Sequence, residues 1–299
     1  MLCKDIIIIT IERMSQFVHH ALMLLEDAGM SVRYPDIHRI TREADGTSSR
    51  RISRSAIQGK RVSIEQNPQM KFMMMFALLD AHVDATDAAL EGLSYRQKYQ
   101  RMPAADDAAM MLRELFRLAK LIRNTLVHHP SAFRIETGQL RITYLHNNTT
   151  FALTMSNMAL RHFYTALQMI LRGDLGTGNY FDGIMRSLYA EVVHGIHAIS
   201  DEFGTALSAP PSGLRIRPHT RQLHLNPQHE SRDGRVFFAA AAEPRPTWES
   251  MDFYLARADR QYLVPVEALD SVHSIAEAAL LRDWQHVARF PALPQLHAA

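Results

Sequence analysis

The chain has 299 residues, a length that allows two domains or one large domain with appendages. Hydrophobic residues make up 47% and charged residues 21%, so the chain can bury a sizeable core and is not a disordered tail. Lys and Arg total 33 against 31 Asp and Glu, and the resulting formal charge of +2 excludes a global attraction to nucleic acid or acidic membranes. Any basic site must therefore be local.

The only cysteine is Cys3, which excludes an internal disulfide framework and any metal site built from several cysteines. The longest early apolar run, residues 6–9 with Ile11, is too short to cross a bilayer, for which about 20 residues are needed. Charged residues flank this run, and no signal-peptide cleavage pattern follows it. We therefore expect a cytoplasmic protein with no membrane partner.

Residues 1–68 are predicted to form an N-terminal helix followed by a basic linker. The helix is indicated by an apolar stripe at steps of three and four, namely Ile7, Ile11, Met14, Val18, Leu22 and Leu25. A short strand over residues 6–11 is the alternative, because periodicity does not settle a short apolar run. Residues 39–61 hold seven basic and two acidic residues, a local charge of +5, with little apolar periodicity. They are typical of a solvated linker or of an arm that contacts phosphates.

Residues 69–206 are predicted to form four helices, which together are typical of a helical bundle. The expected ranges are about 69–90, 107–128, 153–171 and 180–203, with a small hairpin over residues 133–135 and 140–144. The second helix has the clearest apolar stripe, namely Leu112, Leu115, Ala119, Ile122 and Leu126. Asp106 or Asp107 can cap its start, and Pro130 places its end near His128.

Residues 207–299 are predicted to form a small α+β appendage after a linker at residues 209–213. Short strands are expected at residues 214–217, 222–225, 235–241 and 262–266, followed by a helix over residues 266–287. The fold class expected for the whole chain is therefore mainly α.

The segment RNTLVHH, residues 123–129, lies at the end of the predicted helix 107–128 and carries the residues best suited to chemistry. Asn124 and His128 are four residues apart on one helix face, and the long side chain of Arg123 can reach the same place. Arginine supplies a permanent charge with bidentate geometry for a phosphate, and histidine gains or loses a proton near neutral pH. Together these residue types suit the cleavage of a phosphodiester without a metal.

The pattern Arg-Asn, three residues, His, at the end of a helix in a four-helix region, resembles the signature of HEPN domains, the higher eukaryote and prokaryote nucleotide-binding family. The resemblance covers about residues 69–206 and implies a central HEPN-like four-helix bundle. It also implies a metal-independent endoribonuclease that acts on RNA as a homodimer and leaves 2′,3′-cyclic phosphate ends. By the same analogy the protein would be a toxin or defence effector, with an antitoxin or regulatory protein as a further partner.

The resemblance also implies a role for each residue of the motif. His128 would transfer the proton of the RNA 2′-hydroxyl, Arg123 would stabilise the phosphate, and Asn124 would orient the pair. His129 is the other candidate for the place of His128, because the family tolerates variable spacing. No cofactor and no metal are expected. Many HEPN members bind nucleotides or partner proteins without cutting RNA, so a non-catalytic binding module is the alternative.

A purely structural role of the motif is a further alternative. In that case Arg123 would pair with an acid such as Glu114 or Asp80, and His128 would cap the carbonyls at the helix end, where positive charge is favoured.

Two other polar groups are weaker candidates. The first, Glu191 with His194 and His197, resembles half of a di-iron carboxylate motif, but no second copy occurs. The second group alternates histidine with arginine and is either an RNA-contacting surface or a solvent-facing rim; it consists of Arg215, Arg217, His219, Arg221, His224 and His229.

Overall fold

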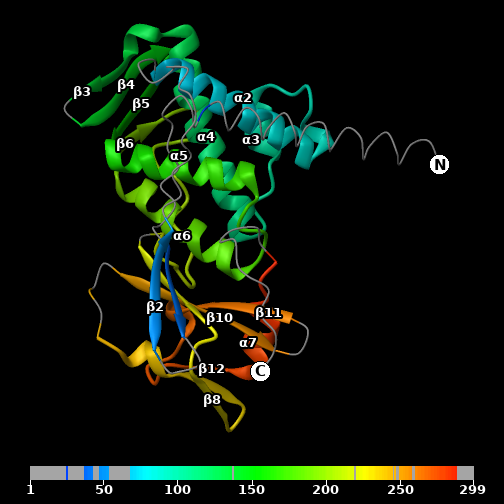
Figure 1. Cartoon of the computed structure of the whole chain (residues 1–299). Coiled ribbons are helices and arrows are strands. Elements are labelled where there is room, and N and C mark those ends of the chain that lie inside the picture. Colours follow the sequence, from blue (N-terminus) through cyan, green and yellow to red (C-terminus); the bar gives the residue numbers. More distant parts are fainter. Residues whose placement is uncertain are drawn as a thin grey trace. The chain divides into compact units, whose positions relative to one another are not determined.

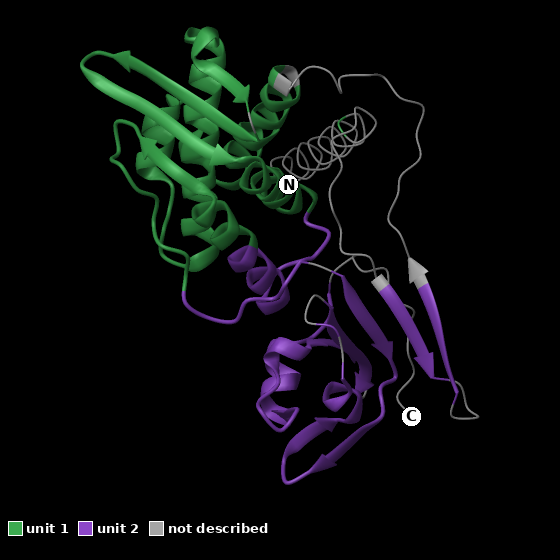
Figure 2. Cartoon of the chain, turned by 90° about the vertical axis from the view of Figure 1, so that its left-hand side faces the viewer, with its two compact units in different colours: residues 1–32, 57–172, 188–211 green, residues 33–56, 173–187, 212–299 purple. Residues whose placement is uncertain are grey.

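The computed structural model describes residues 25, 37–42, 47–53, 68–136, 138–218, 220–244, 246, 249–257 and 260–287. The chain divides into two compact units, each assembled from stretches that are far apart in the sequence (Figure 2). Unit 1 comprises residues 1–32, 57–172 and 188–211, and unit 2 comprises residues 33–56, 173–187 and 212–299. Of the predicted N-terminal helix, only Leu25 is among the described residues, and it is helical and buried.

The fold is mixed α and β, so the prediction of a mainly α protein is wrong. The described residues contain twelve strands in three sheets, besides six α-helices (Figure 1). One of these sheets lies inside the region 69–206, where the sequence pattern predicted a bundle of four helices. A plain helical bundle is therefore excluded for this region.

Unit 1 combines helices with a four-stranded antiparallel sheet of order β3-β4-β5-β6. Its strands are β3 (Phe133–Glu136), β4 (Gln139–His146), β5 (Thr149–Ser156) and β6 (Ile196–Ser200). Its helices are α2 (Pro68–Thr86), α3 (Tyr95–Arg101), α4 (Asp107–His128), α5 (Asn157–Arg172) and the second half of α6 (Asn179–His194). Short 3-10 helices lie at Ala88–Leu90 and Pro130–Ala132. Helices α4 and α5 pack on one face of the sheet (Figure 1).

Helix α4 forms as its sequence predicts. The side chain of Asp106 accepts a hydrogen bond from the Ala109 N–H and caps the first turn. The predicted stripe faces the core, where Leu115, Ala119 and Ile122 are fully buried. The helix ends at His128, two residues before Pro130, which confirms the predicted end.

The third and fourth predicted helices are too long at one end each. Residues 153–156 belong to β5, because Leu153 and Met155 fit the alternation of a half-buried strand as well as a helical period. The fourth helix stops at Gly195, and β6 follows. A Cβ atom on Gly195 would lie 2.5 Å from that of Ala159, so α6 can approach the start of α5 only with glycine at this position. The predicted hairpin is confirmed as β3 and β4.

Unit 2 is built on a five-stranded mixed sheet of order β11-β10-β7-β1-β2, with a three-stranded sheet of order β12-β9-β8. The strands of the larger sheet are β1 (Ile37–Arg42), β2 (Ser48–Ser53), β7 (Arg221–Leu225), β10 (Ser250–Arg257) and β11 (Arg260–Pro265). The smaller sheet contains β8 (His229–Arg232), β9 (Arg235–Phe238) and β12 (Ser274–Ala276). Helix α7 (Glu277–Asp283), the first half of α6 and 3-10 helices at Ala239–Ala242 and Val266–Ala268 complete the unit.

The basic stretch 39–61 is not a simple linker. Its described part lies mostly in β1 and β2, which pair antiparallel with Ile40 opposite Arg50. Strand β1 also pairs in parallel with β7, where Ile40 lies opposite His224. The strands expected at 222–225, 235–241 and 262–266 are confirmed at least in part as β7, β9 and β11, whereas residues 214–217 form no strand and the helix 266–287 shrinks to α7.

The core of unit 2 contains a fully paired arginine. Arg221 is 1% exposed and donates two hydrogen bonds to Asp252, both of 2.8 Å, and two to Glu267, of 2.9 and 2.8 Å. The Tyr180 hydroxyl donates a further bond of 2.9 Å to Asp252. Burial of such charges is tolerated because each charge has an opposite partner, and the loss of one partner leaves the others uncompensated. Arg221, one of the predicted RNA-contacting residues, is therefore part of the core.

Among the helices that the structure describes, none combines the length and the apolar character needed to cross a membrane.

Candidate active site

The last turn of α4 brings together three of the four predicted site residues. Nη1 of Arg123 lies 3.1 Å from Oδ1 of Asn124 and 3.5 Å from Nε2 of His128. His128 is exposed, and Arg123 and Asn124 are half-buried. Because arginine only donates, a hydrogen bond in this contact requires Nε2 of His128 to be the acceptor. A permanent cation, an amide and an imidazole ring thus meet at an accessible helix end.

The acids proposed as structural partners of Arg123 are engaged elsewhere. Glu114 accepts bonds of 3.0 Å from both Tyr99 and Ser208, and Asp80 accepts a bond of 2.6 Å from Lys98. No carboxylate in the described part of the chain pairs with Arg123. Its guanidinium instead lies 5.0 Å from the ring centroid of Tyr95, a cation–π contact that leaves N–H donors for an anion.

A buried ionic network anchors the helix that carries the cluster. Arg117 donates bonds of 3.0 and 2.7 Å to the carboxylate of Asp201, and both side chains are buried. One turn further along α4, Lys120 pairs with Glu202, and burial lowers the pKa of this lysine in spite of its partner. The segment after β6 is thereby tied to α4. This packing fixes the direction in which the last turn of the helix projects.

His129 is directed to a different place from His128. It follows the helix as its C-cap, with its N–H bonded to the carbonyl of Thr125 at 2.8 Å. Its ring stacks on that of Tyr144, with centroids 4.1 Å apart and an angle of 20° between the ring planes. The structure therefore groups His128, and not His129, with Arg123.

Sequence reasoning missed the aromatic residues next to this cluster. Tyr144 stacks in turn on Phe151 at 5.0 Å and 3°, and the His146 ring lies edge-on to His129 and Phe151 at 6.0 and 6.4 Å. We call His129, Tyr144, Phe151 and His146 the aromatic stack. The available signal was Tyr144 at the end of the predicted hairpin, but the contact with His129 is tertiary and has no local pattern.

The possible metal site at Glu191, His194 and His197 is not supported. All three side chains are exposed, and α6 ends at His194, so His197 lies on β6 and does not continue a helical row. In the residues that the structure describes, no three or more His, Cys, Asp or Glu side chains are grouped as metal ligands.

Part of the basic stretch and part of the histidine-arginine group meet at one cavity in unit 2. The cavity has a volume of about 330 Å³, and its lining includes Arg42, Arg50, His224 and Glu243. Arg50 donates to Glu249 at 3.2 Å, and Arg42 donates to the neutral amide of Gln228 at 2.6 Å. Because Glu249 pairs with Arg50 and Glu243 is itself part of the lining, the cavity has little net charge and indicates no particular ligand. His219 lies outside the described residues.

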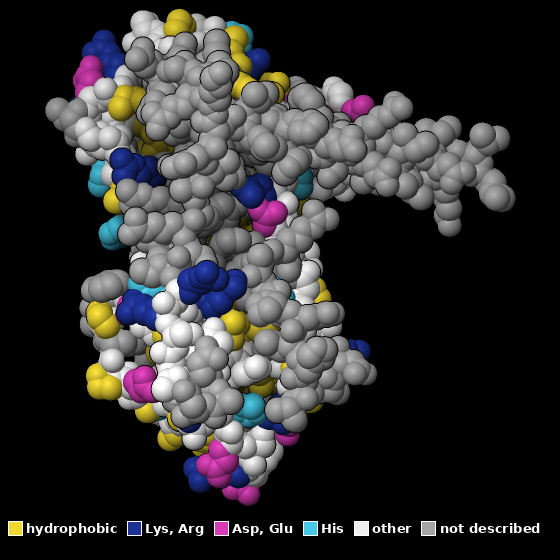
Figure 3. Space-filling model, in the orientation of Figure 1, with side chains coloured by type: hydrophobic (Ala, Val, Ile, Leu, Met, Phe, Trp, Pro, Cys, Tyr) yellow, Lys and Arg dark blue, Asp and Glu magenta, His cyan; other side chains and the backbone are white. Residues whose placement is uncertain are grey.

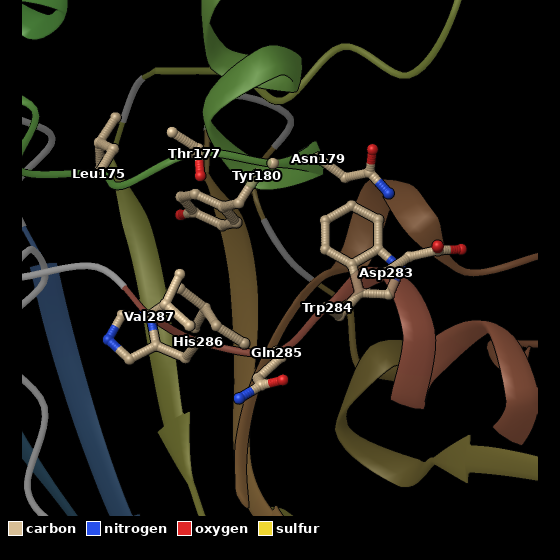
Figure 4. A pocket seen from close by; sticks show the side chains of 11 residues that line it. Leu175, Thr177, Asn179, Tyr180, Asp283, Trp284, Gln285, His286 and Val287 are labelled. Atoms are coloured by element: carbon tan, nitrogen blue, oxygen red, sulfur yellow. The ribbon is translucent and has the colours of Figure 1, made fainter.

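A second pocket of unit 2 lies at the first turn of α6 (Figure 4). The side chains of Tyr180 and Trp284 border it, together with the segment that follows α7. Its volume of about 40 Å³ admits a few water molecules but not a nucleobase.

The described basic side chains do not form one continuous patch on the face seen in Figure 3, where they lie in separate small groups. This distribution agrees with the small net charge and favours a local site.

Comparison with known proteins finds no relative. No family model matches the chain, and neither a curated protein nor a solved structure matches it. The function must therefore be inferred from the residues of the chain itself.

Proposed function

We propose that the chain is a metal-independent endoribonuclease that uses Arg123, Asn124 and His128. The observation that carries this proposal is the convergence of the three side chains at the exposed end of α4, with the Arg123 guanidinium in contact with both others. The likeness to HEPN nucleases supports it through the motif and its helix, and not through the whole fold. A homodimer and a cytoplasmic location belong to the same proposal.

The three side chains match the needs of RNA transesterification. An unprotonated ring nitrogen of His128 takes the proton of the 2′-hydroxyl, whose oxygen forms a bond to the adjacent phosphorus. The bond from phosphorus to the 5′-oxygen breaks, and that oxygen takes up a proton from water. Arg123 donates N–H bonds to the non-bridging oxygens as their charge grows, and Asn124 holds the guanidinium in place. The products end in a 2′,3′-cyclic phosphate and a 5′-hydroxyl.

The test is cleavage of a labelled RNA pool by the full chain in excess EDTA, which removes metal-dependent nucleases. The variants are Arg123→Ala and His128→Ala, each with a matched control. Arg141→Ala removes an exposed arginine of β4, and His194→Ala removes an exposed histidine of α6. Unfolding of all five proteins is compared first, so that lost activity is not lost folding.

We expect the wild type and both controls to cut RNA and to leave cyclic phosphate ends. His128→Ala should lower the rate by about 10²- to 10⁴-fold, as expected for a proton-transfer residue. Arg123→Ala should lower it by roughly 10²- to 10³-fold, the usual effect of losing a donor to the developing charge. A wild type that leaves RNA intact, or site variants that cut like the controls, would refute the proposal and favour the non-catalytic binding module.

A further inference from the structure

The aromatic stack lies where one face of the unit 1 sheet emerges from under the helices. On this face the cross-strand pair Ile142 and Leu153 is buried, and the next pair along the strands, Tyr144 and Phe151, is half-buried. His146, one step further, is exposed. Helix α4 ends at His128, so its cover stops at the beginning of the aromatic residues. The aromatic stack therefore lies between the buried part of this face and its exposed part.

The two ends of the aromatic stack differ from its middle. Tyr144 has a ring against each face, His129 at 4.1 Å and Phe151 at 5.0 Å, so it is internal to the stack. In the part of the chain that the structure describes, the ring contacts of His129 are those with Tyr144 and with the edge of His146, and His129 is half-buried. A planar group placed on the other face of His129 would extend the stack at this end. Successive bases stack on aromatic side chains in this way with little dependence on sequence.

The stack is next to the candidate active site in the chain itself. His129 directly follows His128, and the helix end turns their rings to different partners, Arg123 for His128 and Tyr144 for His129. In a nucleotide, one ribose joins the phosphate to the base. Adjacent residues that offer a phosphate contact and a ring face therefore match the two parts of one nucleotide.

We propose that the aromatic stack binds an unpaired base through His129, next to the phosphate held by Arg123, so that the substrate is single-stranded RNA. This inference rests on the proposed function. Bases in a duplex are stacked on each other and inaccessible to side chains, whereas bases in single strands and loops can be turned out onto aromatic rings.

The test measures binding without cleavage. A fluorescein-labelled, fully 2′-O-methylated oligonucleotide cannot form the cyclic phosphate, and its affinity for the full chain is measured by anisotropy in EDTA. The protein variants are His129→Ala, His129→Phe and His129→Leu, with His194→Ala as the control. Leucine keeps apolar volume without a ring, and phenylalanine keeps the ring. Thermal unfolding establishes that each variant is folded.

We expect His129→Ala and His129→Leu to weaken binding by about tenfold, within the range for loss of one base stack, and His129→Phe to bind like the wild type. The same sequence as a duplex should bind more weakly than the single strand. A further series of oligonucleotides lacks one base each, at successive positions. For one member of this series, the affinity of the wild type should be as low as the affinity of His129→Ala for the intact strand. On that oligonucleotide His129→Ala should cause no further loss.

Equal binding of His129→Ala and wild type, or equal binding of duplex and single strand, would overturn the inference. Its failure is separable from that of the proposed function. Ring-dependent binding without any RNA cleavage leaves the stack as a base-binding site and refutes the nuclease. If cleavage depends on His128 but binding does not depend on a ring at residue 129, the nuclease stands and the base-binding site is refuted. A wild type that neither binds the oligonucleotide nor cuts RNA refutes both.

Discussion

Arg221 in unit 2 and Arg123 in unit 1 show two opposite uses of the same side chain. Arg221 is 1% exposed and bonded to two carboxylates, whereas Arg123 is half-buried and, among the described residues, its partners are an amide, an imidazole and an aromatic ring. The first arrangement neutralises the guanidinium inside the fold. The arrangement of Arg123 leaves its charge and several N–H donors available at the surface, and binding an external anion requires both.

The same contrast occurs within one helix. Arg117 of α4 is 3% exposed and pairs with Asp201, and Arg123 follows it by six residues with no carboxylate partner in the described residues. Pairing, and not residue type or helix, thus separates a structural arginine from a candidate functional one. The arginine variants below test that distinction through the free energy of unfolding.

The largest expected effect is that of Arg221→Met. Methionine leaves Asp252 and Glu267 without their cation inside unit 2, and breaking a buried ion pair in this way costs roughly 3–5 kcal/mol. Urea unfolding measures the loss, and Arg260→Met, at an exposed position of β11, is the control. A loss below about 1 kcal/mol would mean that the network is not structural.

Arg117→Met should destabilise unit 1 by about 3 kcal/mol, because Asp201 is then buried without a cation. Fluorescence and circular dichroism followed against urea give the value. The double variant Arg117→Met/Asp201→Leu should recover part of the stability, since it removes both charges. If the double variant is less stable than the single one, the cost comes from packing and not from the unpaired carboxylate.

A smaller effect is expected from acid. Burial lowers the pKa of His82, His224 and His286 below the ordinary value of 6.5, so the folded state stays neutral where the unfolded chain binds protons. Stability should therefore fall as the pH falls below 6.5, and be independent of these groups above it. Unfolding at pH 7.5, 6.0 and 5.5 measures this trend. Substitution of all three histidines by Gln should make the free energy of unfolding less dependent on pH in this range. An unchanged pH dependence would mean that other groups cause the trend.

The smallest expected effect on stability is that of Arg123→Met, below about 0.5 kcal/mol, because the residue has no buried charge to compensate. The comparison partner is Arg117→Met on the same helix. A loss from Arg123→Met as large as that from Arg117→Met would make Arg123 a structural residue and remove the basis of the proposed function.

The sequence predicted α4, its cap and its end, because these depend on local features: the apolar stripe, Asp106 and Pro130. It therefore placed Arg123 and His128 at a helix terminus. It failed for β5 and β6, since Leu153 and Met155 fit two periods and only the neighbouring strand decides between them. Whether residues 153–156 form a strand or the start of a helix is therefore decided by tertiary contacts.

The greatest misses involve partners far apart in the chain. Strand β1 pairs with β7, where Ile40 lies opposite His224, although more than half of the sequence separates the two residues. No local pattern in a basic stretch predicts such a pairing. The aromatic stack was missed for the same reason, because His129 meets Tyr144 through the packing of α4 on the sheet. Both the motif and its surroundings are needed to describe the candidate site.

The most direct test of the central claim uses a DNA oligonucleotide with a single ribonucleotide, incubated with the full chain in EDTA. If His128 activates a 2′-hydroxyl, the strand is cut once, on the 3′ side of the ribonucleotide, and His128→Ala leaves it intact. Replacing that residue by a 2′-O-methyl nucleotide should abolish the cut. Cleavage at deoxynucleotides, or an uncut strand with the ribonucleotide at every position tried, would contradict the assignment of Arg123, Asn124 and His128 as a ribonuclease site.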